Sequence, residues 1–315
     1  MIDITAVGEI LIDLTQSGVN SLGVPVFDAN PGGAPANLAV AAARLGANAA
    51  FIGKVGADSF GALLKNTLAE NKVDVSGLCV DANNRTTLAV VALDSTGERS
   101  FSFYRNPSAD VNLQIEDICL KRTKFLHFGS VSLTTEPAAS ATLYAVKTAK
   151  EQGAIISYDP NYRPSLWSSE ETAIAQMGAP LSMVDVLKVS DEELPLLTGT
   201  TDLEAGSKLL ADKGISLVLI TLGADGAFYR FKGQTGHIPG VKVTVGDTNG
   251  AGDTFLGAAL AQLCKFDRLE DVTLSRLEEI IAISNKAAAI TASRHGAIPA
   301  MPTYQEVFDE QEKAL

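Results

Sequence analysis

The sequence predicts an α/β protein with one mainly parallel sheet covered by helices. Short β-branched runs alternate with Ala/Leu-rich runs, and the β-branched runs are apolar throughout, as in strands buried on both faces. The expected strands are Ile4–Val7, Ala49–Ile52, Phe125–Phe128, Ala154–Tyr158, Val184–Val189 and Leu217–Thr221. The expected helices are Asn37–Leu45, Ser59–Asn71, Pro137–Gln152, Leu203–Lys213, Asp253–Cys264 and Leu274–Ala292. Right-handed crossovers follow from this alternation, and ligands are expected beyond the carboxyl ends of the strands.

One region departs from the alternation of strands and helices. The β-rich runs Thr86–Leu93 and Arg99–Arg105 flank turn residues at 94–98, which predicts an antiparallel hairpin. Together with Ile10–Leu14 and the loop after it, this hairpin can form a small sheet that projects from the main one. We therefore expect a single domain over residues 1–315 with a β-lid formed by about 10–30 and 84–106.

Composition excludes several functional classes. The chain has 315 residues, 46% of them hydrophobic, and a net charge of −12. Disordered chains are far less hydrophobic, and nucleic-acid or anionic-membrane binders carry a basic face, which this chain lacks. The longest uncharged stretch, residues 29–43, is too short to span a membrane. The N-terminus has no basic leader, and the three cysteines are far apart, so a cytoplasmic protein is expected.

The most informative motif is the run Gly-Asp-Thr-Asn-Gly-Ala-Gly-Asp-Thr-Phe at residues 246–255. Small residues precede an amphipathic helix, so unpaired N–H groups and the helix dipole favour an anion at its N-terminus. An isolated Asp253 would be interpreted as a helix cap. Beside an anion site, its carboxylate is better explained as the acceptor of a proton from a hydroxyl that attacks a phosphate.

Three other sites have less specific patterns. Gly223-Ala-Asp-Gly226 follows a predicted strand and is either a phosphate-binding loop or a plain tight turn. Residues 30–37, Asn-Pro-Gly-Gly-Ala-Pro-Ala-Asn, form a ligand-binding loop or a Pro/Gly loop capped by Asn37. Asp13 is an acidic residue in an apolar run, and a buried carboxylate needs partners, which sugar hydroxyls can supply. The fingerprints of dinucleotide-binding and Walker A loops are absent.

Together these residues resemble the ribokinase-like sugar kinases, the family that includes the B-type phosphofructokinases. The early signature spans residues 32–37 and continues through 46–56, and the specific late signature spans 247–253. Within the family, residues 8–13, 103–107 and 159–167 are most similar to bacterial and plant fructokinases. The 2-keto-3-deoxygluconate kinases share part of the last element and remain the alternative. A non-catalytic sugar-binding regulator and a dinucleotide oxidoreductase are the rival classes.

The resemblance implies a ribokinase-like three-layer α/β/α sandwich with a mainly parallel sheet and a small β-lid. It further implies an ATP-dependent kinase that converts D-fructose to fructose 6-phosphate, with Mg²⁺, possible use of K⁺ and a homodimer. Asp253 is then the catalytic base, and the amides of Gly250, Ala251 and Gly252 form the anion hole. The implied sugar-side residues are Asp13, Gly32, Gly33, Asn37, Arg105 and Arg163. The implied ATP-side residues are Thr221, Gly223, Gly226 and Asn285.

The resemblance implies the cation sites less directly than the sugar-side and ATP-side residues. Glu193 matches the family's magnesium-linked Asn-x-x-Glu motif, but Ser190 replaces the asparagine. Asp247 and Ser293 occupy positions that suit a monovalent cation. From the residues alone, Arg105 shares a face of the predicted hairpin with Phe103, so it can either cover the sugar from the lid or form a surface salt bridge. Arg163 follows the end of a predicted strand, where ligands are expected, and both arginines can also hold a keto acid's carboxylate. Lys54 is either paired structurally or close to a substrate oxygen.

Overall fold

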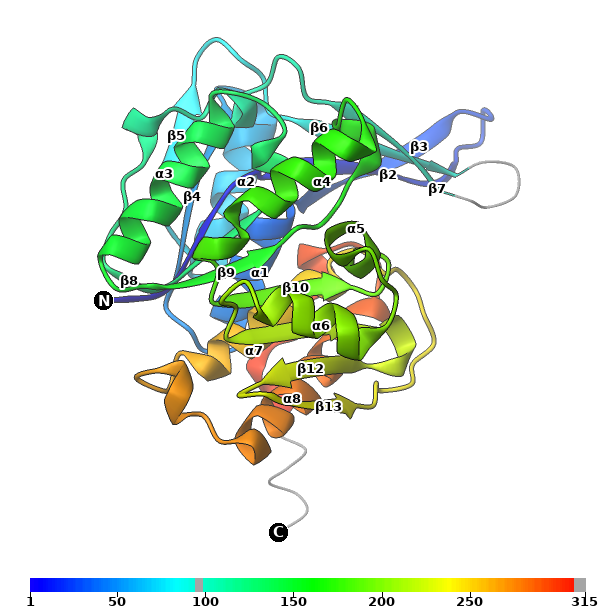
Figure 1. The fold of residues 1–315 in the computed structure, drawn as a ribbon. Helices are drawn as coiled ribbons and strands as arrows, with labels where there is room; N and C mark the ends of the chain where they lie inside the picture. Colours follow the sequence, from blue (N-terminus) through cyan, green and yellow to red (C-terminus); the bar gives the residue numbers. More distant parts are fainter. Residues whose placement is uncertain (94–98, 309–315) are drawn as a thin grey trace.

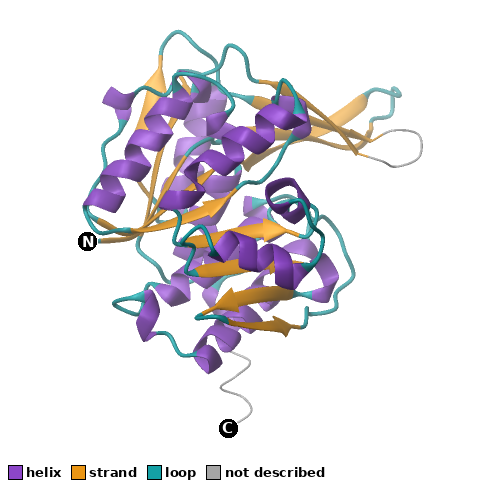
Figure 2. Ribbon diagram, viewed as in Figure 1, coloured by secondary structure: helices purple, strands orange, loops and turns teal. Residues whose placement is uncertain are grey.

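The computed structural model describes residues 1–93 and 99–308. The fold is built around a large, mainly parallel sheet (Figures 1 and 2). Its strand order is β13-β12-β11-β10-β9-β8-β1-β4-β5. The strands are β1 (Ile2–Val7), β4 (Ala49–Gly56), β5 (Asp74–Asp81), β8 (Thr123–Gly129), β9 (Ile155–Asp159), β10 (Val186–Ser190), β11 (Leu217–Thr221), β12 (Ala227–Phe231) and β13 (Gln234–Ile238). Along the sheet from β5 to β11, every pair of neighbouring strands is parallel. At the other edge, β12 pairs antiparallel with β11, and β13 pairs antiparallel with β12.

Helices cover both faces of this sheet, which confirms the expected three-layer α/β/α fold (Figure 1). One layer contains α1 (Ala34–Arg44), α2 (Ser59–Glu70), α7 (Ala251–Leu263) and α8 (Leu274–Ala292), with α9 (Tyr304–Phe308) packed on α8. The other contains α3 (Ala138–Glu151), α4 (Glu170–Gly178), α5 (Leu194–Thr198) and α6 (Leu203–Ala211). Alternate strand residues enter the two cores: Ile4 packs with α7 and α8, while Val7 packs with α3.

Short 3₁₀ turns link many of these elements. They are η1 (Asp110–Asn112), η2 (Ile115–Asp117), η3 (Val131–Leu133), η4 (Pro164–Leu166), η5 (Ala179–Met183), η6 (Gly223–Asp225), η7 (Leu269–Asp271) and η8 (Ile298–Ala300). Several of them follow the carboxyl ends of strands, where the loops of interest lie. No helix of the described ranges is long and apolar enough to cross a membrane.

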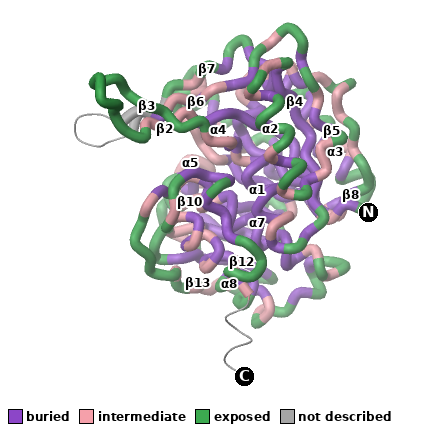
Figure 3. Tube along the Cα trace, turned by 180° about the vertical axis from the view of Figure 1, so that it is seen from behind, coloured by how far each residue is buried: buried purple, intermediate pink, exposed green. Residues whose placement is uncertain are grey.

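A second, four-stranded sheet projects from the body (Figure 1). Its order is β3 (Pro25–Gly32), β2 (Leu11–Val19), β6 (Leu88–Leu93) and β7 (Arg99–Tyr104). The predicted hairpin is present, since β6 and β7 pair antiparallel, although its predicted turn at 94–98 lies outside the described residues. Strand β3 was expected only as a loop; most of its residues are exposed, so it lacks the apolar pattern of a buried strand (Figure 3).

Helix α1 begins at Ala34, three residues before the predicted start at Asn37. Pro35 lies in its first turn, where the missing N–H removes no helical hydrogen bond. Asn37 is therefore a helical residue with a buried side chain and not a cap. This shift matters because it turns Asn37 toward the start of α7, against which α1 packs.

Close packing of α1 against α7 gives a stability prediction. A Cβ at Gly257 would lie 2.8 Å from Ala41 Cβ and 2.9 Å from the Leu38 carbonyl oxygen. We expect Gly257→Ala to lower the free energy of unfolding by roughly 1 kcal/mol or more, because the strain exceeds the gain in helix propensity. Urea denaturation measures the change. Gly178→Ala is the matched control, since nothing lies within 4 Å of the added methyl group; equal effects of the two would contradict the packing.

Candidate active site

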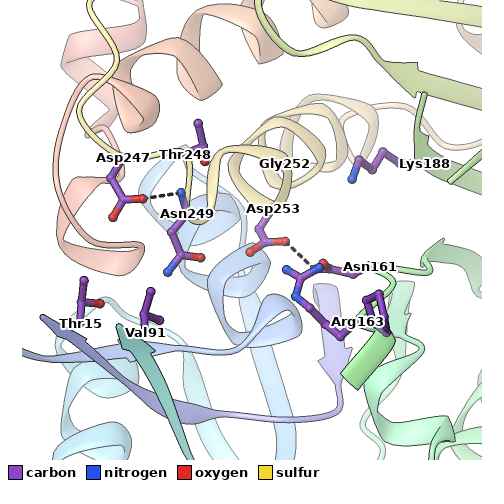
Figure 4. A pocket seen from close by; sticks show the side chains of 12 residues that line it. Thr15, Val91, Asn161, Arg163, Lys188, Asp247, Thr248, Asn249, Gly252 and Asp253 are labelled. Atoms are coloured by element: carbon purple, nitrogen blue, oxygen red, sulfur yellow. Dashed lines mark hydrogen bonds between the residues drawn. The ribbon is translucent and has the colours of Figure 1, made fainter. Parts of the chain in front are cut away.

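Asp253 lies in the first turn of α7 and is buried. Asn37 Nδ2 on α1 donates to its Oδ2 at 2.8 Å, and Asn161 Nδ2, in the loop after β9, donates to its Oδ1 at 3.3 Å (Figure 4). Both carboxylate oxygens are thus oriented by amides from separate parts of the chain. Burial raises the pKa of Asp253, and Asn37, Lys188 and Arg163 oppose that rise.

The N-terminus of α7 presents unbonded N–H groups beside this carboxylate. Gly250 precedes the helix with a φ of 76°, a left-handed conformation that suits glycine. Ala251 N–H donates to the Thr248 carbonyl at 3.2 Å. Within the described ranges, the N–H groups of Gly250, Gly252 and Asp253 have no hydrogen-bond partner. The donors available to an anion are therefore these three, whereas the predicted donor Ala251 is already bonded to Thr248.

Two cavities meet at Asp253. A larger one of about 370 Å³ has walls that include Lys188, Gly250 and Gly252, together with Thr15 and Val91 of the projecting sheet (Figure 4). A smaller one of about 50 Å³ is lined by residues from the ends of β1, β2 and β7 and the start of α1: Glu9, Leu11, Asp13, Gly33, Ala34, Asn37 and Phe103, among others. Both cavities share four lining residues: Asn161, Arg163, Asn249 and Asp253. A ligand in either cavity can therefore approach the same carboxylate.

Asp13 lines the smaller cavity from strand β2. Asn249 Nδ2 donates to its Oδ2 at 3.3 Å, and burial raises its pKa to about 6. On the paired strand β3, Gly32 leaves room for this carboxylate, because a Cβ there would overlap it. Gly33 has a φ of 103°, and a Cβ there would lie 2.7 Å from the Glu9 carbonyl oxygen. Gly32 thus lets the chain pass close to the Asp13 carboxylate, and Gly33 lets it pass close to the backbone of Glu9.

Lys188 supplies a positive charge beside the anion-binding end of α7. Its Nζ donates to Asp159 Oδ2 at 3.0 Å, and both side chains are buried. A Cβ at Gly252 would lie 3.2 Å from this Nζ, which places the ammonium next to the helix start. Burial raises the pKa of Asp159, and the Lys188 ammonium opposes that rise. The Lys188 ammonium can therefore interact both with Asp159 and with an anion bound at the N-terminus of α7.

The two arginines proposed for the sugar have different surroundings. Arg163 lines both cavities and lies beside Asp253 in Figure 4. Arg105 lines neither cavity in the described ranges. It is buried at the root of the projecting sheet, where its Nε donates to Asp110 Oδ2 at 2.7 Å and its Nη1 to Thr134 Oγ1 at 2.6 Å.

Three of the residues expected on the ATP side lie at or just after the carboxyl end of β11, and the fourth, Asn285, lies on α8. Thr221 ends β11 and pairs with Ser190 of β10. Gly223 and Gly226 follow with φ values of 56° and 96°. Asn285 Nδ2 donates to the carbonyls of residues 238 and 239, each at 3.1 Å, and so holds the loop after β13. None of these four expected residues lines the two cavities.

The residues expected near cations are engaged by backbone amides. Glu193 accepts from the N–H groups of Tyr162, at 2.7 Å, and Ser190, at 2.8 Å. Asp247 accepts from the N–H groups of Asn249 and Gly296, at 2.9 and 3.2 Å. Both carboxylates therefore fix loops at the rim of the site.

Two further side chains complete this account of the expected residues. Ser293 is exposed, and its Oγ donates to the Ile290 carbonyl at 2.7 Å. Lys54 is paired structurally, since its Nζ contacts the Asn112 carbonyl at 3.0 Å and Asp117 Oδ2 at 2.5 Å. It lines neither cavity in the described ranges.

Four charged or amide side chains that line this site were not predicted from the sequence. Asn161 and Asn249 lie inside motifs that drew attention only to their neighbours. Lys188 is the one charged residue in the apolar strand β10, which is a usable signal for a buried ion pair. Glu9, which lines the smaller cavity, lies in the same run, residues 8–13, as Asp13.

Comparison with known proteins identifies the family. The model of the pfkB family carbohydrate kinases matches residues 1–304. The chain belongs to this family. It is 46% identical to a probable fructokinase-4 of Arabidopsis thaliana over 96% of this chain and 95% of the relative. The expected resemblance to sugar kinases, and to fructokinases in particular, is confirmed.

Solved structures of the family share the fold. A fructokinase of Xylella fastidiosa with bound ATP has a TM-score of 0.91 at 34% identity, covering 99% of both chains. A fructokinase double mutant of Vibrio cholerae O395, with fructose, ADP and a potassium ion bound, has a TM-score of 0.89 at 36% identity, covering 98% of both. The ribokinase-like fold expected from the sequence is thus confirmed, and the chain is a carbohydrate kinase.

The buried Asp13 carboxylate gives a prediction about pH and stability. Its pKa in the folded protein is about 6 against an ordinary 3.8, so ionisation opposes folding as the pH rises through this range. We expect Asp13→Asn to raise the free energy of unfolding at pH 8 by up to about 3 kcal/mol, and this gain to vanish near pH 4. Urea denaturation at both pH values measures it. The exposed Asp28→Asn is the control, and a pH-independent gain for Asp13→Asn would contradict the prediction.

Proposed function

We propose that this pfkB-family kinase phosphorylates D-fructose with ATP and produces fructose 6-phosphate. The observation that carries the proposal is Asp253, a buried carboxylate placed between two cavities of different character. One cavity has carboxylates suited to accept hydrogen bonds from sugar hydroxyls, and the other has the unbonded amides and the lysine suited to bind phosphate. The fructokinases among the relatives, one with bound fructose and ADP, support the choice of substrate.

The proposed reaction is an in-line phosphoryl transfer. Asp253 accepts the proton of the sugar's 6-hydroxyl group as its oxygen forms a bond to the γ-phosphorus of ATP. The bond between this phosphorus and the bridging oxygen breaks, and ADP leaves with the electron pair. The amides at the start of α7 and the Lys188 ammonium stabilise the charge on the phosphoryl oxygens. Asn37 and Asn161 hold the carboxylate in position for the proton.

Magnesium fits this site only as a partner of the nucleotide. Within the described residues, no group of three or more His, Cys, Asp or Glu side chains is placed to hold a metal ion. Glu193 uses both carboxylate oxygens on backbone amides. Mg²⁺ would therefore take its ligands from phosphate oxygens and water, with Glu193 acting through the loops that it holds. When bound, the ion neutralises phosphate charge.

A monovalent cation is proposed near the loop that precedes α7. The N–H groups of Gly246 and Asp247 both donate to the Ala292 carbonyl, so this loop lies against the end of α8, where Ser293 follows. Asp247 also accepts from Asn249 and Gly296. K⁺ in this region would stabilise the geometry of the anion-binding loop. The potassium ion in the Vibrio cholerae relative supports the choice of ion.

The charges at the sugar end favour fructose over 2-keto-3-deoxygluconate. Asp13 and Glu9 line the smaller cavity, and Asp253 stands at its junction with the larger one. Arg105, a proposed partner for the keto acid's carboxylate, is already paired with Asp110. A neutral sugar is not repelled by these carboxylates. The carboxylate of the keto acid would be repelled by them, and Arg163 is the cation that lines the cavity.

The projecting sheet is proposed as a lid and a dimer contact. Thr15 and Val91 of this sheet line the larger cavity, so its position determines access to the site. Its outer part exposes the apolar side chains of Val19, Leu22 and Val24, which favours a homodimer.

The acceptor is tested by measuring ADP release with MgATP against a panel of sugars, with and without K⁺. The panel contains fructose, 2-keto-3-deoxygluconate, ribose, glucose and adenosine. We expect fructose to give the highest kcat/KM, with K⁺ increasing turnover. A preference for the keto acid would contradict the fructose assignment while leaving the kinase chemistry intact. Absence of turnover on every sugar would support a non-catalytic sugar-binding protein.

The role of Asp253 is tested by Asp253→Asn. The amide keeps the side chain's shape but cannot accept the proton, so we expect kcat to fall by about 10²–10⁴-fold while ATP affinity is retained. Steady-state kinetics and calorimetric titration with ATP measure the two effects. Asp271→Asn, at an exposed position in η7, serves as the control. A kcat reduced less than about tenfold would show that Asp253 is not the general base.

A further inference from the structure

Glu9 is a buried carboxylate that the proposed mechanism does not use. It follows β1 and is only 3% exposed. Its Oε1 accepts from the Ala34 N–H at 3.2 Å, at the start of α1. Its Oε2 is buried without a hydrogen-bond partner among the described residues. Buried acceptors normally receive a hydrogen bond, so we expect a donor from outside the described residues to bind this oxygen.

The nearest cation does not satisfy Glu9. Arg105 is close enough to lower the pKa of Glu9, yet burial dominates and raises that pKa to about 7. Arg105 instead directs two of its nitrogens to Asp110 and Thr134, and its Nη2 is itself buried without a partner in the described ranges. Asp110 is held in turn by Ser108 and Thr87. The Arg105 guanidinium is thus held by Asp110 and Thr134, and Glu9 receives no hydrogen bond from it.

Glu9 lines the smaller cavity, where Asp13 and Asp253 also lie. The electrostatic neighbours of Asp13 include Asp253 and Arg163, whereas those of Glu9 are Arg105 and Asp110. Glu9 also lines only the smaller cavity, not the larger one that presents the phosphate-binding amides. It therefore belongs to the end of the cavity remote from phosphoryl transfer.

We propose that Glu9 is a specificity-determining residue that accepts a hydrogen bond from a sugar hydroxyl at the end of the substrate remote from the phosphorylated group. This inference rests on the proposed fructokinase function. For a furanose whose 6-hydroxyl faces Asp253, the groups at the far end are the hydroxyls on C1 and C2. A hydroxyl there satisfies the orphaned carboxylate oxygen, whereas a sugar without it leaves that oxygen unpaired.

The test compares fructose with 1-deoxyfructose and 2,5-anhydromannitol, which lack the C1 or the C2 hydroxyl but keep the 6-hydroxyl. The variant is Glu9→Gln, which preserves the side chain's shape and the acceptor for the Ala34 N–H. We expect its KM for fructose to rise at least tenfold, with the KM for ATP and kcat changing less than about threefold. For the analogue that lacks the hydroxyl bound by Glu9, the substitution should change kcat/KM less than about threefold.

The outcomes separate the possible failures. An equal loss of kcat/KM for fructose and both analogues would overturn the proposal and make Glu9 a structural residue. An unchanged KM for fructose would also overturn it. If the wild-type protein does not phosphorylate fructose at all, the proposed function fails first, independently of the variant. Glu70→Gln, at an exposed position at the end of α2, is the matched control, and thermal unfolding shows that each variant is folded.

Discussion

The structure depends on one buried carboxylate, Asp253, at the point where α7 begins. A buried charge is costly unless it is hydrogen-bonded, and Asn37 and Asn161 satisfy its two oxygens from segments far away in the sequence. Helix α1, the loop after β9 and the start of α7 must therefore converge for this carboxylate to be accommodated. The same convergence places the unbonded amides of α7 beside it and joins the two cavities there.

Charge balance around this carboxylate explains the rest of the site. Asp253, Asp159 and Asp13 are acidic groups whose pKa burial raises, and Lys188 and Arg163 are the cations that oppose the rise. Carboxylates that are difficult to ionise accept protons more readily, which suits a base that must take a hydroxyl proton near neutral pH. The stability lost by burying these groups is the kind of local cost expected at a functional site.

Much of the fold and the centre of the site could be predicted from the sequence because their signals are local. The buried strands are short apolar runs, and Gly250, Gly252 and Asp253 lie within one contiguous motif. Strand β3 was missed because most of its residues are exposed and carry no alternating pattern. The predicted start of helix α1, Asn37, is three residues too late because Pro35 is typical of a loop as well as of a first helical turn.

The missed site residues depend on contacts across the fold. Asn161 reaches Asp253 from 92 positions away and adopts a φ of 49°, which no local pattern reveals. The unpaired oxygen of Glu9 is evident only when its surroundings are known. The predicted strand face shared by Phe103 and Arg105 favours a contact of Arg105 with the sugar, but β7 ends at Tyr104, and Arg105 pairs with Asp110 beyond that end. The roles of these residues become clear only from their tertiary contacts.

The most direct test of the central claim is a crystal structure with fructose and a non-hydrolysable ATP analogue. The account predicts that the sugar's 6-hydroxyl oxygen lies within hydrogen-bond distance of the Asp253 carboxylate, roughly 2.6–3.2 Å. It also predicts the γ-phosphate of the analogue at the N–H groups of Gly250 and Gly252. A sugar bound with its 6-hydroxyl away from Asp253, or a γ-phosphate held elsewhere, would contradict it.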